Sequence, residues 1–267
     1  MTSIPEFHPK AHGSKATQFD MGGVPIHSVT SSQVFGFIDQ TIRDRQRALV
    51  LNVNIHCISL AWKHDWLKEF LNEAQMVFCD GDGPRWGLKL LGYPPPPKIP
   101  LTRWIWTLGD HCRTKRHRLF LLGATPGTAE LAGQRLKAQF PGLKLVGVHH
   151  GYFQKTGEEN LEIIDKINRA QPHILIVAFG MPLQEQWLKE NAHRLNANIL
   201  MPGGGVLDYA AGKLGKAPAW MLKLHLEWLF RIWEEPRRLF LRYFIELPQF
   251  FISIHTIRQS SKKVPKG

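Results

Sequence analysis

The sequence predicts an α/β protein: a Rossmann-like, mostly parallel sheet with helices on both faces, followed by a helical C-terminal appendage. The first observation behind this is that six short apolar segments, typical of buried strands, alternate with helical segments. The second is that each apolar segment runs into polar or glycine-rich residues. Carboxyl ends of parallel strands border one crevice, so these residues are expected to meet in one active site.

The predicted strands are rich in Val, Ile, Leu and Phe, as buried strands usually are. They cover Val50–Asn54, Met76–Cys79, Leu119–Leu122, Leu145–Val148, Ile174–Phe179 and Ile199–Met201. The segments that follow them are His56, Asp80–Gly83, Gly123–Gly127, His149–Tyr152, Gly180–Glu185 and Gly203–Asp208.

Helix starts are indicated by proline and capping residues. Pro126 and Pro182 stand where proline favours a first helical turn, and Thr156 with Glu159 has the spacing of a capping box. The helices predicted from these signals cover Gly127–Phe140, Asn160–Ala170 and Leu183–Leu195. Strand–helix alternation implies right-handed crossovers and hence parallel strands.

Three regions are expected along the chain. Residues 1–20 should be a disordered N-terminus, 21–217 the α/β core, and 218–267 a helical, basic and aromatic appendage broken at Pro236 and Pro248. The prolines of Tyr93–Pro100 favour a rigid polyproline II connection at the rim of the core.

Charge and cysteine usage restrict the class of protein. The net charge of +12 over 267 residues calls for an anionic partner: nucleic acid, an anionic membrane or a phosphorylated substrate. Cys57, Cys79 and Cys112 form no C-x-x-C pair, so they support neither a disulfide framework nor a structural zinc site. No stretch approaches the roughly 18 apolar residues of a spanning helix, and we expect a cytoplasmic protein.

Asp80-Gly81-Asp82 allows two functional interpretations. It matches the short D-x-D pattern in which two carboxylates bridge a metal ion to a nucleotide diphosphate. Asp80 alone, at the end of a strand, could instead serve as a general base in the crevice. A turn aspartate that caps the helix starting at Pro84 remains the structural alternative.

The glycine-rich segments differ in how strongly they indicate a ligand. Gly123 and Gly127, at the start of a helix, could present backbone N–H groups to a phosphate or form an ordinary strand–helix turn. Gly203–Gly205 favours ligand contact, because three glycines after a strand destabilise it unless the backbone passes close to another group.

Other polar residues allow both a functional and a structural interpretation. Gln184 and Glu185 could bind a uracil or a sugar, or form a solvated first turn favoured by the helix dipole. Asn52 and Asn54 suit sugar hydroxyls as well as capping, and the His149–His150 pair lacks a third metal ligand at metal spacing.

Arginines of the appendage could bind phosphate. Arg231, Arg238 and Arg242 would share one helical face, and arginine suits bidentate phosphate binding. A solvated basic face is the alternative. The surrounding tryptophans and phenylalanines also suit a segment lying on an anionic bilayer.

The order of these motifs resembles that of the WecG/TagA/CpsF family of bacterial glycosyltransferases, from about Val24 to Tyr243. So many matches in one order are more specific than any single motif. The matching residues are Asn54, Asp80-Gly81-x-Gly83, Phe120–Gly123, Pro126-Gly127, Phe140–Leu143, Gly151–Phe153, Gly180-x-Pro182-x-Gln184-Glu185-x-Trp187, Gly204-Gly205-x-x-Asp208-x-x-Ala211-Gly212, Ala217-Pro218-x-Trp220, Leu226-Glu227-Trp228-x-x-Arg231, Glu235-Pro236-x-Arg238 and Arg242-Tyr243.

The resemblance implies an inverting, metal-independent transfer from a UDP-sugar to a lipid-linked acceptor at the cytoplasmic face of the membrane, in wall-polymer or surface-polysaccharide synthesis. The donor of the best-known members is UDP-N-acetylmannosamine. The resemblance further implies that Asp80 is the general base, and that the segment carrying the three arginines folds over the crevice and contacts the diphosphate.

Two departures from the family pattern concern the substrate. The family usually has Arg-x-x-Gly-x-Asp after its Asp-Gly motif, where this chain runs from Lys98 to Arg103, and Asn52 replaces a common threonine. Arg103 in place of an acidic group reverses the local charge. Either a different donor or acceptor, or a loss of activity, would follow.

The predicted function is a glycosyltransferase with a UDP-sugar donor, a lipid-linked glycan acceptor and an anionic membrane contact through the appendage. No cofactor, metal or nucleic acid is expected, and the oligomeric state, a homo-oligomer included, stays open. A metal-dependent D-x-D transferase and a non-catalytic module binding membrane or RNA are the alternatives. Predicted substrate-binding residues are Asn52, Asn54, Lys98, Arg103, Gly123, Tyr152, Gly180, Gln184, Glu185, Gly204, Gly205, Asp208, Arg231, Arg238 and Arg242.

Overall fold

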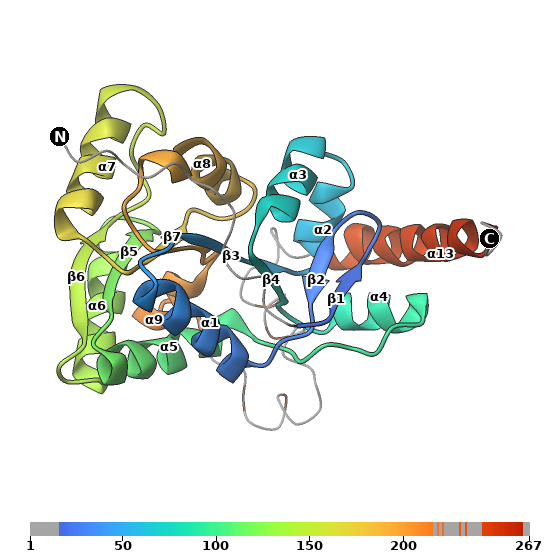
Figure 1. The fold of residues 1–267 in the computed structure, drawn as a ribbon, viewed down its shortest axis with the longest axis horizontal. Coiled ribbons are helices and arrows are strands. Elements are labelled where there is room, and N and C mark those ends of the chain that lie inside the picture. Colours follow the sequence, from blue (N-terminus) through green and yellow to red (C-terminus); the bar gives the residue numbers. More distant parts are fainter. Residues whose placement is uncertain are drawn as a thin grey trace.

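The computed structural model describes residues 16–215 and 242–263, and between them only Pro218, Met221, Phe230 and Trp233. Six parallel strands form one sheet in the order β4-β3-β8-β7-β5-β6 (Figure 1). This confirms the predicted fold class and all six predicted strands. Their bounds are β3 (Ala48–Val53), β4 (Met76–Cys79), β5 (Arg118–Gly123), β6 (Lys144–His149), β7 (Ile174–Ala178) and β8 (Ile199–Pro202).

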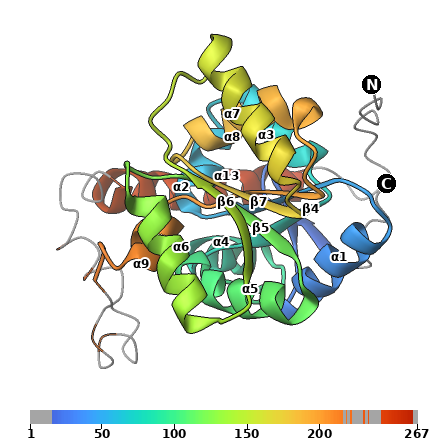
Figure 2. The ribbon, with the colours of Figure 1, turned by 90° about the vertical axis from the view of Figure 1, so that its left-hand side faces the viewer.

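Helices cover both faces of this sheet (Figure 2). One face carries α2 (Ile55–Ala61), α3 (Asp65–Glu73), α7 (Gly157–Ala170) and α8 (Leu183–Asn191), which continues as the 3-10 turn η1 (Ala192–Arg194). The other carries α1 (Ser31–Arg43), α5 (Leu101–Lys115), α6 (Thr128–Gln139) and α9 (Val206–Ala211). This is the doubly wound arrangement that parallel strands with helical crossovers produce.

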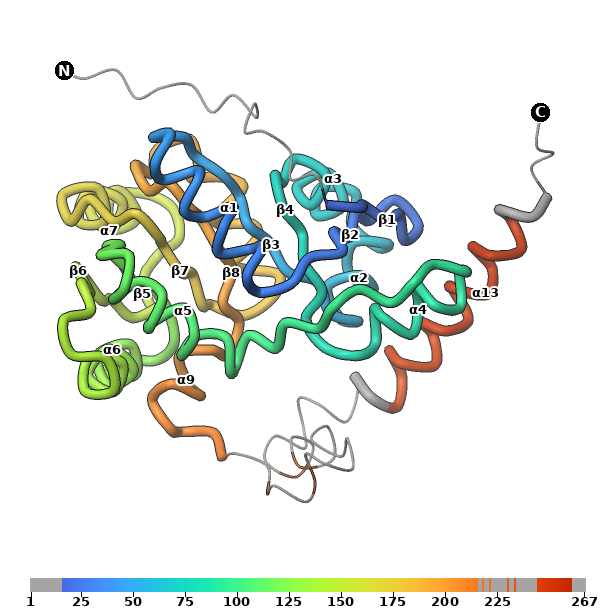
Figure 3. Tube along the Cα trace, turned by 60° about the horizontal axis from the view of Figure 1, so that its bottom comes forward, coloured from blue at the N-terminus to red at the C-terminus, as the bar shows by residue number. Residues whose placement is uncertain are grey.

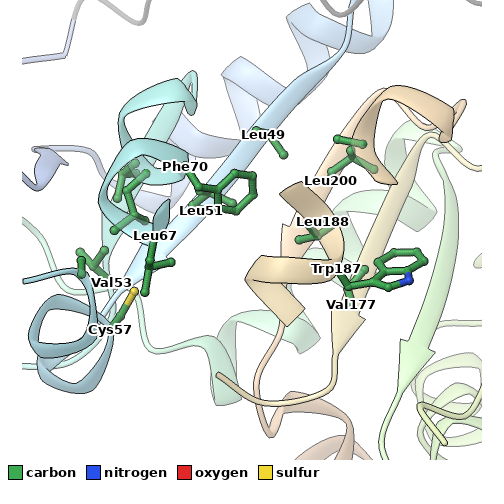
Figure 4. Packing of buried hydrophobic residues seen from close by; sticks show 14 of the residues in the cluster. Leu49, Leu51, Val53, Cys57, Leu67, Phe70, Val177, Trp187, Leu188 and Leu200 are labelled. Carbon is green, nitrogen blue, oxygen red and sulfur yellow. The ribbon is translucent and has the colours of Figure 1, made fainter. Parts of the chain in front are cut away.

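The two faces bury separate hydrophobic cores, as alternation along β3 illustrates. Leu49, Leu51 and Val53 point to one core, where Figure 4 shows Leu51 near Phe70 of α3 and Val53 near Cys57 of α2. Ala48 and Val50 belong to the other core. Successive side chains of a strand point to opposite faces, so a strand covered on both sides reads as one continuous apolar run.

Caps at the helix starts differ from the prediction in detail. Thr156 is the N-cap of α7, but its side chain makes no capping bond, so the predicted capping box does not form. Glu159 instead accepts a hydrogen bond from the Gln154 N–H at 2.7 Å. A capping box does form at α1, where Thr30 and Gln33 satisfy each other's backbone N–H groups.

A small hairpin precedes the sheet and was not predicted. β1 (Gln18–Asp20) and β2 (Pro25–His27) pair antiparallel across a turn in which Asp20 accepts from the Gly23 N–H. Within the described residues the first regular element starts at Gln18, and residues 1–15 lie outside them.

The end of the chain returns to the sheet domain. The π-helical segment η2 (Arg242–Glu246) leads into α13 (Leu247–Lys263), which lies beside α4 (Gly83–Leu91) and α2 (Figure 3). Phe250 is buried and stacks on Trp62, with ring centroids 5.5 Å apart. Pro248 stands in the first turn of α13, where proline is tolerated, so it starts this helix and does not break it. Of the helices described, none is both long and apolar enough to cross a bilayer.

Candidate active site at the carboxyl edge of the sheet

The sheet has a topological switch point between its neighbouring strands β3 and β8. The chain leaves β3 into α2 on one face and leaves β8 into α9 on the other. In open α/β sheets, ligands bind in the crevice that such diverging connections leave at the carboxyl ends of the strands. Most of the polar residues singled out by the sequence stand on this edge.

Asp80 directly follows β4, the neighbour of β3. Its backbone N–H donates to Val53 O at 2.9 Å, which fixes Asp80 beside the end of β3. Its Oδ1 accepts a long hydrogen bond of 3.4 Å from the Leu101 N–H, at the start of α5. The side chain is partly exposed at the crevice, where a general base could reach a substrate hydroxyl.

Asp82 lies two residues on and is held by two cations. Its Oδ1 lies 2.8 Å from Arg85 Nη1 and its Oδ2 lies 2.6 Å from Lys98 Nζ. Burial raises the pKa of Asp82, but the hydrogen bonds and charges of Lys98 and Arg85 outweigh it and hold the pKa below its usual range. Both carboxylate oxygens are therefore already engaged. Arg103, on the first turn of α5, is exposed.

Two asparagines near the end of β3 have different structural roles. Asn54 is the N-cap of α2, and its Oδ1 accepts from the Cys57 N–H at 3.0 Å. Asn52 is 2% exposed, and its Nδ2 donates to Pro202 O of β8 at 3.0 Å. Among the described residues the buried Oδ1 of Asn52 has no hydrogen-bond partner. Asn52 therefore links β3 to β8 at the switch point, and its Oδ1 is an acceptor without a hydrogen bond among the described residues.

Glycines at the strand ends fall into two groups. A Cβ on Gly123 would lie 2.3 Å from Ala178 O, so this glycine permits the close approach of β5 and β7. At Gly180, Gly204 and Gly205 a Cβ would meet no atom within 4 Å. These three leave open space above the backbone, the arrangement expected where a ligand approaches the main chain.

Gln184, in the first turn of α8, connects the loops after β7 and β8. Its Oε1 accepts from the N–H of Gly204 at 2.9 Å and of Gly180 at 3.3 Å. Its Nε2 donates to Glu185 Oε1 at 2.7 Å. Gln184 is fully buried, so the alternative of a solvated first turn is wrong.

Glu185 is a buried carboxyl next to this connection. It is 2% exposed, and within the described part of the chain its Oε2 has no hydrogen-bond partner. Burial raises the pKa of Glu185 to about 7. The carboxyl therefore changes protonation near neutral pH.

The loop after β6 folds back over β5 and β7. The Gly151 N–H donates to Ala124 O at 2.8 Å, and Lys155 Nζ lies 3.8 Å from the centroid of the Phe153 ring. Tyr152 stands at the rim, 68% exposed, and Asp208 lies in the first turn of α9, partly buried. Lys155, which the sequence reasoning missed, also donates to Gly151 O at 2.6 Å and so orders this loop.

Three predicted residues of the appendage fall outside this geometry. Arg231 and Arg238 lie outside the described residues, and of Arg242 only the backbone, in η2, is described. The C-terminal segment nevertheless reaches the edge of the crevice through His56 and Glu246, whose side chains meet at 2.8 Å. No local pattern in the sequence indicates this pair.

Comparison with known proteins identifies the family. The model of the glycosyl transferase WecG/TagA/CpsF family matches residues 19–264. The chain belongs to this family. It is a glycosyltransferase and not a non-catalytic basic module. It is also similar to two proteins named N-acetylglucosaminyldiphosphoundecaprenol N-acetyl-beta-D-mannosaminyltransferase. The one from Bacillus spizizenii is 26% identical over 92% of each chain, and the one from Staphylococcus aureus strain MW2 is 26% identical over 95% of this chain and 97% of its own.

Proposed function

We propose that this glycosyltransferase moves a sugar from a UDP-sugar to a polyprenyl-diphosphate-linked glycan, with inversion and without a metal ion, in wall-polymer or surface-polysaccharide synthesis. The acceptor is taken from the names of the relatives, which specify N-acetylglucosaminyl diphosphoundecaprenol. The observation that carries the proposal is the position of Asp80. Its backbone N–H donates to Val53 O at the end of β3, beside the switch point between β3 and β8.

Inversion needs one general base and no covalent intermediate. The relatives' names specify a β-linked sugar, so transfer from an α-linked UDP-sugar reverses the anomeric configuration. Asp80 would accept the proton of the acceptor hydroxyl as its oxygen attacks the anomeric carbon, while the UDP group leaves with the bonding electrons. Asn52, Gln184 and the open backbone at Gly204 would position the donor.

Metal independence is supported by the partners of Asp82. A D-x-D site would need this carboxylate to leave both Arg85 and Lys98 in order to bind a cation. The charge of the leaving diphosphate would instead be balanced by helix N-termini, the glycine-rich turns and the arginines of the appendage. Membrane contact through the C-terminal segment would bring the enzyme to its lipid-linked acceptor.

The test first screens UDP-sugars as donors. Turnover is then measured for Asp80→Asn, for Asp110→Asn and for the parent protein with EDTA. Asp80→Asn should keep donor affinity while turnover falls by about 10²-fold or more, the scale of losing a general base. Asp110→Asn, which alters an exposed pair with Arg113, is the matched control and should leave turnover unchanged. Chelation with EDTA should leave most of the turnover intact. Near-normal turnover of Asp80→Asn would contradict the role of the base, and activity abolished by EDTA and restored by Mn²⁺ would favour the D-x-D mechanism.

A further inference from the structure

A cluster of metal-binding side chains lies at the amino edge of the sheet, away from the crevice. Asp39 belongs to α1, His111 to the last turns of α5, and His117 directly precedes β5. Asp39 Oδ1 and a ring nitrogen of each histidine lie within 4.8 Å of one another. Because β5 has six residues and spans about 17–20 Å, the cluster is roughly one strand length from the crevice.

We propose that Asp39, His111 and His117 bind a divalent cation of the zinc class, which holds α1 and α5 to the start of β5. Both helices lie on the same face of the sheet (Figure 2). The ion is structural, and the glycosyl transfer at the opposite edge does not use it.

The distances fit such an ion after a small adjustment. Asp39 Oδ1 lies 2.8 Å from His111 Nε2 and 2.7 Å from His117 Nε2. In a tetrahedral zinc site with bonds of about 2.0–2.1 Å, ligand atoms are about 3.3 Å apart. These two separations therefore have to grow by about 0.5 Å, and the two ring nitrogens, which lie within 4.8 Å of each other, have to reach the same spacing.

The two imidazole rings are already oriented by their neighbours. Phe35 stacks on His111 with ring centroids 4.4 Å apart and planes inclined by 12°. His173 contacts His117 edge-on at 5.6 Å. Phe35 and Asp39 are four residues apart on α1 and so share one face of that helix. Little side-chain freedom remains to be lost when an ion binds.

The donor set selects the class of ion. Two imidazoles and one carboxylate suit Zn²⁺ and its first-row neighbours, whereas Mg²⁺ and Ca²⁺ prefer oxygen ligands. In the ion-free form both Nε2 atoms donate to Asp39 Oδ1. An ion would take their lone pairs, and each ring would carry its proton on Nδ1 instead. Asp39 and His111 are partly exposed, so the ion and a fourth ligand, water, reach the site from solvent.

Lys115 allows a test by the direction in which metal affinity changes. Its Nζ lies 3.8 Å from Asp39 Oδ2, and its side chain is half exposed. A cation bound at Asp39 is repelled by this ammonium group. Lys115→Ala should therefore tighten metal binding, an effect that a purely hydrogen-bonded His–Asp–His cluster does not predict.

The experiment uses the full chain, stripped of metal with a chelator and titrated with Zn²⁺ alone. Calorimetry should show binding of Zn²⁺ at one site, with an affinity that the ligand variants Asp39→Asn and His117→Gln reduce. Zn²⁺ at 100 times its Kd should raise the folding equilibrium constant about 100-fold. The thermal midpoint should then rise by about 5 °C or more. Co²⁺ should give visible absorption bands of a low-coordinate site, and Mg²⁺ at equal concentration should give no shift.

Two ligand variants, one control and Lys115→Ala locate the ion. Asp39→Asn and His117→Gln should each lower Zn²⁺ affinity by at least about tenfold, since even outer-sphere partners are worth that much. The double variant His149→Gln/His150→Gln, which alters a histidine pair at the other edge, should bind Zn²⁺ as the parent does. Lys115→Ala keeps the test decisive if a ligand variant fails to fold. An unshifted midpoint in Zn²⁺, affinity unchanged in Asp39→Asn, or affinity not increased in Lys115→Ala would overturn the proposal.

Discussion

The Nδ1 atom of His56 lies 2.8 Å from Oε2 of Glu246, across 190 positions of the sequence. His56 stands in the first turn of α2, after β3, and Glu246 is the last residue of η2. Both side chains are mostly buried. This contact holds the C-terminal segment against the strand end that borders the crevice.

Glu246→Gln should loosen that attachment. A hydrogen bond to a charged, partly buried group contributes about 1.5–3 kcal/mol, and the amide keeps part of it. Amide hydrogen exchange in α13 should speed up by about tenfold. Asp65→Asn, which breaks an exposed pair with Lys68, is the control and should change exchange little. Unaltered exchange in Glu246→Gln would show that α13 is held by Phe250 and its apolar neighbours alone.

Gln184→Ala should impair both stability and transfer. It leaves the N–H groups of Gly180 and Gly204 without their shared acceptor, at a cost of about 1–3 kcal/mol in unfolding free energy. Turnover should fall by at least about tenfold, because the loops after β7 and β8 lose their link. The exposed Gln186, two residues on in the same helix, offers the matched control Gln186→Ala. Equal turnover in the two variants would remove Gln184 from the site.

Glu185 should make stability fall as pH rises through neutrality. Burial raises its pKa from 4.5 to about 7 in the folded protein, so between these values the folded state holds a proton that the unfolded state has released. The stabilisation is fully present below pH 4.5 and is lost as pH rises through 7, up to about 3 kcal/mol. Glu185→Gln removes this titration. Chemical denaturation at pH 5 and pH 8 should show a smaller loss of stability for Glu185→Gln than for the parent, and equal losses would refute the assignment.

Exposed apolar side chains of the C-terminal segment should mediate membrane contact. Phe244 is 59% exposed and Ile252 is 67% exposed, on a segment that also carries Arg258. The double variant Phe244→Ser/Ile252→Ser should lower partition onto anionic vesicles by about tenfold or more. Leu161→Ser, on α7 and 51% exposed, is the control. Cosedimentation that does not distinguish the double variant from Leu161→Ser would place the membrane contact elsewhere.

Alanine replacement of Arg231, Arg238 and Arg242 should affect transfer more than vesicle binding. These arginines are proposed to contact the diphosphate, while other basic residues and aromatic anchors keep the protein on the membrane at about 1 kcal/mol per charge. A triple variant with normal transfer would leave them the role of a solvated basic face.

Local patterns were sufficient to predict the strands and their ends. Val50 and Leu51 lie in an apolar run because both faces of β3 are covered, so the run itself marks the strand. The hairpin around Asp20 was missed because its strands have three residues each, too short for any periodicity. The predicted capping box at Thr156 does not form, because the Glu159 carboxylate accepts a hydrogen bond from the Gln154 N–H in the preceding loop.

The roles of the site residues stay predictions, but their position was predictable where a single strand end carries the signal, as at Asp80 and Gly204. It was not predictable where partners are distant in sequence. His111 and His117 stand 72 and 78 positions from Asp39, a spacing that belongs to no known ligand motif. Residue type does not predict burial either, because Gln184 and Gln186 are the same amino acid in one helix and only Gln184 is buried.

The pairing of β3 with β8 has the shortest register in the six-stranded sheet. These two strands are in register at Ala48–Ile199 and Leu49–Leu200, near the amino edge, and further along the Asn52 side chain donates to Pro202 O. Every other pair of neighbouring strands is in register over four or five residues. The candidate site therefore lies above the boundary at which the halves β4-β3 and β8-β7-β5-β6 share the fewest backbone pairs.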